Sequence, residues 1–155
     1  MASQWNLNEV QKRLAQTKRE LPIRLAKQAE NHFTDAFSKG RLDDKVWSNV
    51  NRRIPGTKEF KYKIKGISQQ AKRSNPILVG NGILRGRVSN SIKEASWGNI
   101  KLVVDLPYAK IHNEGGQAGR NLSVTIPARP YMVQTSNLTQ MQTKLITDTL
   151  NKIWK

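Results

Sequence analysis

The sequence predicts an α+β fold in which a small, mainly antiparallel sheet packs against a long, kinked N-terminal helix and a C-terminal helix. Apolar residues recur at helical spacing near both ends of the chain, and short segments with alternating apolar residues lie between them. Interleaved helices and short strands are typical of the α+β class. The chain has 155 residues, and single domains usually have about 100–200. We therefore expect residues 1–155 to form a single domain.

The first element is predicted to be a helix that begins after Asn6, whose side chain can cap it, with Glu9 three residues further on. Pro22 lacks an amide hydrogen and clashes with the preceding turn, so we expect a kink or a break near Leu21. Gly40 suits the left-handed residue that ends many helices. The apolar stripe of this helix consists of Val10, Leu14, Leu21, Leu25, Ala29, Phe33 and Phe37.

The next segment, residues 41–76, has little apolar content. Trp47 is expected to anchor it, and Phe60, Tyr62 and Ile64 alternate with lysines, as in a strand with one apolar and one basic face. We predict a hairpin arm or a mobile loop here, with a basic part at residues 52–74 that projects from the core.

The second half is predicted to alternate between helices and strands. After a short strand at residues 77–79, Asn81 caps a helix, and Pro107 starts a second, short helix. Ser136 or Asn137 caps the last helix. The inner face of the first of these helices is expected to consist of Leu84, Val88, Ile92 and Ala95. The expected strands carry alternating apolar residues, namely Ile100, Leu102, Val104 and Leu106, and then Leu122, Val124 and Ile126.

Charge is the strongest signal in the composition. Lys and Arg number 27 against 11 Asp and Glu, which gives a formal net charge of +16. Between Arg52 and Lys93 there are 11 basic residues and one acidic residue, Glu59. Such a block can hold a polyanion, because each neutralised phosphate releases a counterion. The alternative is a solvated basic arm that docks on an acidic protein. The predicted contacts of the arm with nucleic acid or a partner are Arg52, Arg53, Lys58, Lys61, Lys63, Lys65, Lys72 and Arg73.

Signals of catalysis are weak. The chain has no cysteine, which excludes disulfides, zinc-thiolate sites and a cysteine nucleophile. Its two histidines, His32 and His112, lie in different predicted elements, and no serine nucleophile accompanies His112 and Glu114. The acidic residues do not cluster into a metal site. We expect no enzymatic activity and no metal or cofactor. A membrane span is not expected either, because no apolar stretch is longer than three residues.

Three blocks of sequence carry a resemblance. Residues 33–40 read Phe-Thr-Asp-Ala-Phe-Ser-Lys-Gly, followed by Trp47 and Arg52-Arg53, and residues 77–85 read Ile-Leu-Val-Gly-Asn-Gly-Ile-Leu-Arg. The third block is the most specific: Tyr-Ala-Lys-Ile-His-Asn-Glu-Gly-Gly at residues 108–116 and Thr-Ile-Pro-Ala-Arg-Pro-Tyr-Met at residues 125–132. Together these blocks resemble the tailed-phage virion morphogenesis family, the tail-completion or neck proteins of Mu-like and P2-like phages.

The resemblance implies a structural virion protein that acts in head–tail joining, as a neck, tail-completion or tail-terminator component. The implied partners are further copies of the chain in a ring, and portal, connector or tail-tube proteins, with possible contact to genomic DNA. The implied location is the neck or the head-proximal tail end, after assembly in the host cytoplasm. The motif residues that we expect to support the fold or an interface are Tyr108, His112, Gly115, Gly116, Arg129 and Pro130. The planar guanidinium of Arg129 suits a carboxylate, either on a neighbouring subunit or within its own fold.

Two other functions remain open. The main alternative is a basic accessory protein that binds nucleic acid without sequence specificity. A weaker one is a small hydrolase built on His112 and Glu114.

Overall fold

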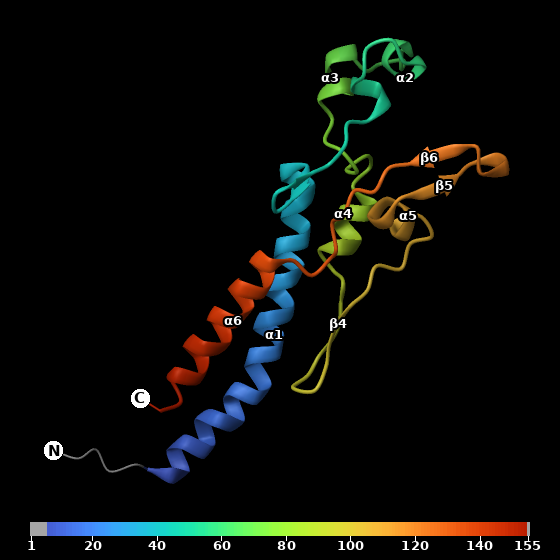
Figure 1. Cartoon of the computed structure of the whole chain (residues 1–155). Helices are drawn as coiled ribbons and strands as arrows, with labels where there is room; N and C mark the ends of the chain where they lie inside the picture. The colour runs from blue at the N-terminus through green and yellow to red at the C-terminus, as the bar shows by residue number, and fades with distance from the viewer. Residues whose placement is uncertain (1–5, 155) are drawn as a thin grey trace. The chain divides into compact units, whose positions relative to one another are not determined.

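The computed structural model describes residues 6–154 and confirms the α+β class. A long helix α1 and a C-terminal helix α6 accompany small antiparallel pairs of strands (Figure 1). In chain order the elements are α1 (Leu7–Lys39), β1 (Arg41–Leu42), β2 (Lys45–Val46), the 3-10 turn η1 (Asn51–Arg53), α2 (Lys58–Lys61), α3 (Gln69–Ser74), α4 (Ile83–Val88), β3 (Ile92–Ala95), β4 (Ile100–Leu102), α5 (Ala109–Glu114), β5 (Gly116–Ala118), the 3-10 turn η2 (Arg120–Leu122), β6 (Val124–Ile126) and α6 (Ser136–Asn151).

The chain divides into two compact units. The helix-pair unit contains residues 6–32, 90–103 and 134–154, and the motif unit contains residues 33–89 and 104–133. The motif unit holds all three sequence blocks described above, so the candidate site lies within it.

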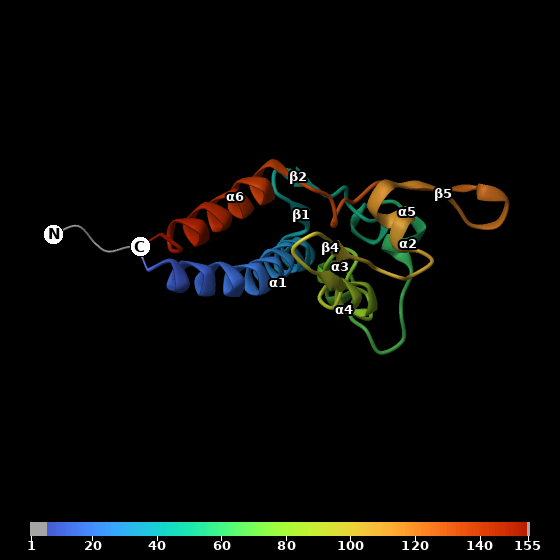
Figure 2. The same cartoon turned by 90° about the horizontal axis from the view of Figure 1, so that it is seen from below.

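In the helix-pair unit, α6 runs antiparallel to the first part of α1. Three side-chain contacts join the helices, from Thr135 to His32 (3.4 Å), from Arg24 to Thr149 (3.4 Å) and from Arg13 to the Lys152 carbonyl (3.5 Å). Figure 2 shows the two helices side by side. The buried apolar residues of the unit are Leu21, Ala26, Ala29, Leu138 and Ile153.

Helix α1 continues without a break through Pro22. The predicted break is therefore wrong, although the amide missing at Pro22 leaves one helical carbonyl without its usual donor. Leu21 and Pro22 are both buried, and this packing offsets the loss. The N-terminal cap is as expected, because the amide of Glu9 donates to Asn6 Oδ1 at 3.4 Å. The cap of α6 is Thr135, whose hydroxyl accepts from the Leu138 amide, and not Ser136 or Asn137.

Ile92 and Ala95 lie in strand β3, so the helix predicted to carry them is shorter than expected. Helix α4 keeps Leu84 and Val88 on its buried face, as predicted. At Ser91 the chain is already extended, because the Ser91 amide donates to Glu30 Oε1 at 2.9 Å and its carbonyl accepts from Val103. These bonds hold the chain in the β3–β4 pair.

The six strands form three separate two-stranded antiparallel pairs, and no hydrogen-bonded ladder joins one pair to another within residues 6–154. The antiparallel direction is as predicted, and a single sheet is not present in this part of the chain. Strands β1, β2 and β5 were not predicted, since two or three residues are too few to show alternation. No helix in the described part of the chain is long and apolar enough to cross a membrane.

Candidate functional site

The centre of the motif unit is the segment that follows β6, residues 128–132, which we call the strap. Helix α5 holds it from one side through main-chain groups. The Arg129 amide donates to the His112 carbonyl at 2.9 Å, and the Tyr131 hydroxyl donates to the Ala109 carbonyl at 2.9 Å. The side chain of Asn113 accepts from the amides of Tyr131 (3.0 Å) and Met132 (3.1 Å). The two halves of the third sequence block therefore bind each other.

A second segment, residues 47–49, also binds the strap. The indole of Trp47 donates to the Pro130 carbonyl at 2.7 Å. Arg129 donates from Nε to the Ser48 carbonyl at 3.1 Å and from Nη2 to the Asn49 carbonyl at 3.2 Å. Arg129 is buried, and its planar fork therefore binds main chain of its own unit. Of the two partners considered for Arg129 from the sequence, the structure shows the one within its own fold, with carbonyls in place of a carboxylate.

Aromatic packing covers the strap. The Phe37 ring lies edge-on to Trp47, with 5.6 Å between centroids, and 5.2 Å from the Tyr131 ring. All three side chains are buried, so Trp47 is the anchor that the sequence predicted. Burial, and to a smaller extent the nearby Tyr108, raises the pKa of Tyr131 to about 12. Tyr131 therefore keeps the proton that it donates to Ala109.

Gly115 and Gly116 join α5 to β5 where side chains have little or no room. A Cβ on Gly115 would lie 2.8 Å from the Ala128 amide nitrogen, and its φ of +78° is rarely adopted by other residues. At Gly116 a Cβ would lie 3.5 Å from Ile111, an ordinary contact, but φ is +149°. The expectation that these glycines support the fold agrees with this geometry.

His112 and Glu114 do not form an acid–base pair among the described residues. Glu114 approaches Lys110 at 4.0 Å, and the Nδ1 atom of His112 is buried without a hydrogen-bond partner. Burial, and to a smaller extent Arg129, lowers the pKa of His112. Tyr108, which immediately precedes α5, packs edge-on against the His112 ring, with 6.0 Å between the ring centroids. No group of three or more potential metal ligands occurs within residues 6–154.

The basic segment, residues 52–74, contains the short helices α2 and α3 and no strand, so the strand predicted around Phe60, Tyr62 and Ile64 is wrong. Phe60 lies in α2, which Thr57 caps by accepting from the Phe60 amide. Ser68 caps α3 in the same way through the Ala71 amide. Alternating residues suggested a strand, but each cap satisfies a free amide at a helix start and favours a helical turn. A hairpin arm is therefore not present.

Four of the eight basic residues predicted to contact a partner instead bind groups within residues 52–76. Arg52 Nη2 donates to the carbonyls of Asn75 (2.8 Å) and Pro76 (3.1 Å), and Arg53 donates to those of Arg73 (2.7 Å) and Asn75 (2.9 Å). Lys72 is buried and donates to the Tyr62 carbonyl. The Arg73 guanidinium lies 3.6 Å from the centre of the Phe60 ring, a cation–π contact. These four residues hold the two ends of the segment together.

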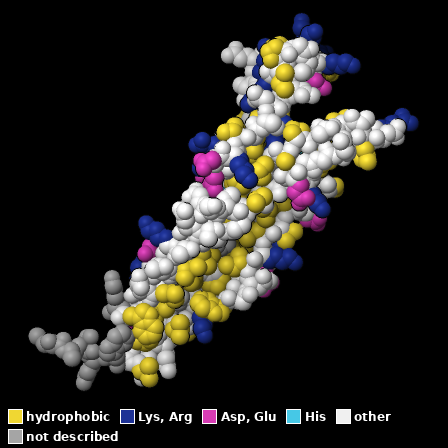
Figure 3. Space-filling view, viewed as in Figure 1, with side chains coloured by type: hydrophobic (Ala, Val, Ile, Leu, Met, Phe, Trp, Pro, Cys, Tyr) yellow, Lys and Arg dark blue, Asp and Glu magenta, His cyan; other side chains and the backbone are white. Residues whose placement is uncertain are grey.

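The other four predicted contacts, Lys58, Lys61, Lys63 and Lys65, are exposed. Their side chains make no hydrogen bond or ion pair with the rest of the described chain, which leaves them available to an anionic partner. Figure 3 shows Lys and Arg side chains in dark blue around the helical turns of α2 and α3, at the top of the view. The structure therefore divides the predicted set into four structural residues and four exposed ones.

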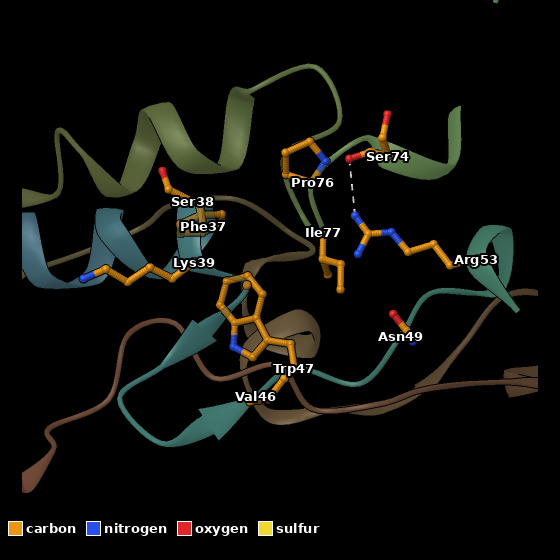
Figure 4. A pocket seen from close by; sticks show the side chains of 11 residues that line it. Phe37, Ser38, Lys39, Val46, Trp47, Asn49, Arg53, Ser74, Pro76 and Ile77 are labelled. Atoms are coloured by element: carbon orange, nitrogen blue, oxygen red, sulfur yellow. Dashed lines mark hydrogen bonds between the residues drawn. The ribbon is translucent and has the colours of Figure 1, made fainter. Parts of the chain in front are cut away.

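Two cavities lie in the motif unit. Residues that are next to each other in the sequence line different cavities. The first, about 340 Å³, is lined by Phe37, Trp47 and Ile77, with Lys39 and Arg53 beside them (Figure 4). The second, about 440 Å³, is lined by Arg52, His112 and Arg129 together with apolar side chains. Asn49, Arg53 and Ile77 belong to the first cavity, while their neighbours Val50, Arg52 and Leu78 belong to the second.

Sequence reasoning did not single out Asn113 or Glu30. Asn113 lies inside the third block, but asparagine before a glycine pair suggests an ordinary turn, and its two amide donors come from residues 18 and 19 positions away. Glu30 is buried and accepts from Ser91 and Lys27. The sequence offered one signal for Glu30, its position beside Ala26, Ala29 and Phe33 on the apolar stripe of the helix. A carboxylate at such a position is buried only when it has a partner.

Comparison with known proteins gives one short match. A segment of 29 residues is 59% identical to the Mu-like prophage FluMu G protein 2 of Haemophilus influenzae. This segment spans 19% of the present chain and 21% of that protein. No family model matches the chain, and no solved structure matches it. The match indicates a phage-related protein, and it supports the bacteriophage part of the resemblance given above.

Proposed function

We propose that this chain is a structural virion protein that acts in phage head–tail joining, as a neck, tail-completion or tail-terminator component. The observation that carries the proposal is the match to a Mu-like prophage protein. This match supports a phage-related protein. The head–tail role is suggested by the three sequence blocks, which stand in the order expected of the tailed-phage virion morphogenesis family. The first and third blocks also meet at the strap, where Trp47 donates to the Pro130 carbonyl and Tyr131 donates to the Ala109 carbonyl, and this use of motif side chains to hold main chain together supports a structural role.

A structural role is favoured over a catalytic one by the way in which the motif residues are used. Arg129, Tyr131 and Asn113 each use side-chain polar atoms to bind main-chain groups. A catalytic acid or base needs hydrogen-bond access to a substrate. The proposed partners are further copies of the chain in a closed ring and portal, connector or tail-tube proteins, and the proposed location is the neck or the head-proximal tail end.

Averaged images of purified particles carrying a tag on this chain test the proposal. We expect density for a closed ring of copies at the neck or at the head-proximal tail end. Particles made without the chain should accumulate as separate heads and tails. A single copy per particle, an open filament, or joined and infectious particles without the chain would contradict it.

Nucleic-acid binding is the second candidate, and the four exposed lysines of the basic segment favour it. Since they have no partner in the described chain, each can neutralise a phosphate. The test is the affinity of the isolated chain for a labelled DNA duplex over a range of salt concentrations. Affinity that falls steeply with salt and is lost in a Lys58, Lys61, Lys63 and Lys65→Gln variant would support this function, together with absence of the chain from particles.

A further inference from the structure

The second cavity of the motif unit contains positive charge with no acidic residue to balance it. Its lining includes the guanidinium groups of Arg52 and Arg129 and the imidazole of His112. The remaining lining residues are Val50, Leu78, Val79, Gly80, Asn81, Leu84 and Tyr108, none of them acidic. Two guanidinium groups beside one cavity repel each other unless an anion lies between them or near both.

Burial is the main cause that lowers the pKa of both arginines, and neighbouring positive charge adds to it. Burial, and after it the charge of Arg52, lowers the pKa of Arg129. Burial, and after it the charge of Arg53, lowers the pKa of Arg52. Each positive form is therefore less stable here than in water, and a negative group in the cavity would reverse that effect.

Nitrogen atoms without hydrogen-bond partners around the cavity also suggest that it binds an anion. Arg52 Nε and His112 Nδ1 are buried without a hydrogen-bond partner in the described chain. Arg129 places Nε and Nη2 on carbonyls, and its Nη1 group has no partner among residues 6–154. Buried polar groups in native proteins are nearly always bonded, so the two buried, unpartnered nitrogens of Arg52 and His112 around one cavity call for a ligand.

The apolar side chains that line the cavity indicate which kind of anion it can bind. Val50, Val79, Leu84 and Tyr108 give the cavity apolar sides, and its volume of about 440 Å³ is in the usual range of protein ligand pockets. A nucleic-acid backbone is a broad, hydrated polyanion that suits the exposed lysines of the basic segment better. A carboxylate on an apolar protein segment matches both the charge and the walls.

We propose that this cavity is a docking site for an acidic side chain, aspartate or glutamate, carried on an apolar segment of a partner protein. The carboxylate binds the guanidinium groups of Arg52 and Arg129, for which a planar two-oxygen group is the natural partner. The flanking apolar side chains of the partner pack against Val79, Leu84 and Tyr108. This inference does not depend on the virion location, since it concerns the isolated chain.

The two histidines make a direct assay possible, because imidazole resonances in NMR report on His112 in the cavity and on His32 in the other unit. The full chain is titrated with a capped peptide that has one glutamate between leucines, with the matching glutamine peptide, and with inorganic phosphate. We expect the glutamate peptide to shift the His112 resonances to saturation while those of His32 stay in place. The affinity of the glutamine peptide should be lower by a factor of about ten or more, which is the contribution of one charge-assisted hydrogen bond to binding.

Arg52→Gln and Arg53→Gln form a matched pair of variants. Both arginines donate to the Asn75 carbonyl, but only Arg52 lines this cavity. We expect Arg52→Gln to weaken the glutamate peptide by about tenfold and Arg53→Gln to leave it unchanged. Should Arg52→Gln not fold, Val79→Phe fills the cavity without changing charge and should abolish binding.

Three results would overturn the proposal. The first is equal binding, or no binding, of the glutamate and glutamine peptides. The second is a His112 shift with phosphate but not with the glutamate peptide, which would assign the cavity to a phosphate group. The third is an equal loss in the Arg53→Gln variant, or full binding by the Val79→Phe variant.

Discussion

At the scale of single residues, Arg129 shows why an arginine stands in the third sequence block. Its fork reaches two consecutive carbonyls, those of Ser48 and Asn49, from two different nitrogens. A lysine donates from a single nitrogen on a flexible stem and lacks the rigid fork that matches two neighbouring carbonyls. Neither the bond nor the burial of Arg129 is visible in the sequence, because its partners lie about 80 positions away.

Gly115 gives a prediction at the same scale. Gly115→Ala should lower the free energy of unfolding by at least about 2 kcal/mol, because the backbone conformation is almost confined to glycine. The new methyl group would also meet the Ala128 amide at 2.8 Å. Thermal or urea unfolding followed by circular dichroism measures the change.

Gly86→Ala is the matched control, since Gly86 lies in α4 with open space at its Cβ position. Alanine is the better helix former, so this variant should be unchanged or more stable by up to about 1 kcal/mol. Equal stability of the Gly115→Ala variant and the wild type would show that the turn after α5 is free to rearrange.

His112 gives a pH dependence. Burial first, and Arg129 second, lowers its pKa below the ordinary 6.5. The unfolded chain therefore binds the proton more readily, so this contribution to stability is present above pH 6.5 and is lost as the pH falls below it. We expect the wild type to lose stability between about pH 7 and pH 5, and a His112→Gln variant to lose less. Identical slopes for the two proteins would contradict this role of His112.

At the scale of elements, long periodic helices were predictable and short segments were not. Helix α1 and helix α6 carry enough turns for their apolar spacing to be recognised. Ile92 and Ala95 were assigned to a helix because they continue the helical spacing of Leu84 and Val88. The bonds of Ser91 to Glu30 and Val103, which place them in a strand pair, can be seen only in the structure. Alternation around Phe60 failed for the same reason, with two local caps favouring helical turns.

The basic segment gives a prediction at this scale about proteolysis. Lys61, Lys63 and Lys65 are exposed, and the chain between α2 and α3 has no helix or strand. Arg53 and Lys72 are instead bonded to carbonyls. Trypsin should therefore cut first after the three lysines, because cleavage requires an accessible and locally open chain.

Mass spectrometry of the earliest fragments identifies the bonds that are cut. An Arg53→Gln variant serves as the control for the carbonyl bonds, and it should make the bonds after Lys72 and Arg73 easier to cut. First cleavage of the wild type after Lys72 or Arg73 would show that α3 is open in solution.

At the scale of the whole molecule, the sequence predicts where charge lies but not which charges are available. The net charge of +16 and its concentration in residues 52–93 are plain in the sequence. Arg52, Arg53, Lys72 and Arg73 proved to be structural because carbonyls and rings of their own segment lie within reach. The motif residues were likewise predictable as a set, whereas the cavity beside Arg129 depends on segments that are far apart in the chain.

In the assembling virion, the effect of the exposed lysines of the basic segment can be separated from the effect of the net charge of the chain. Changing Lys61, Lys63 and Lys65 together to Glu reverses three exposed charges that have no partner in the described chain. If the basic segment meets an acidic partner or DNA during assembly, this variant should fold normally and fail to give joined, infectious particles, because like charges repel at a contact built for opposite ones.

The control is Lys12, Lys18 and Lys144→Glu, three exposed lysines in the helix-pair unit that give the same change in net charge. Particle titre and circular dichroism are measured for both variants. We expect the titre to fall only when the basic segment is changed, since surface charges away from a contact have little effect. Normal titre in both variants would mean that the exposed lysines serve only to keep the protein in solution, and an equal fall in both would mean that total charge, and not the basic segment, limits assembly.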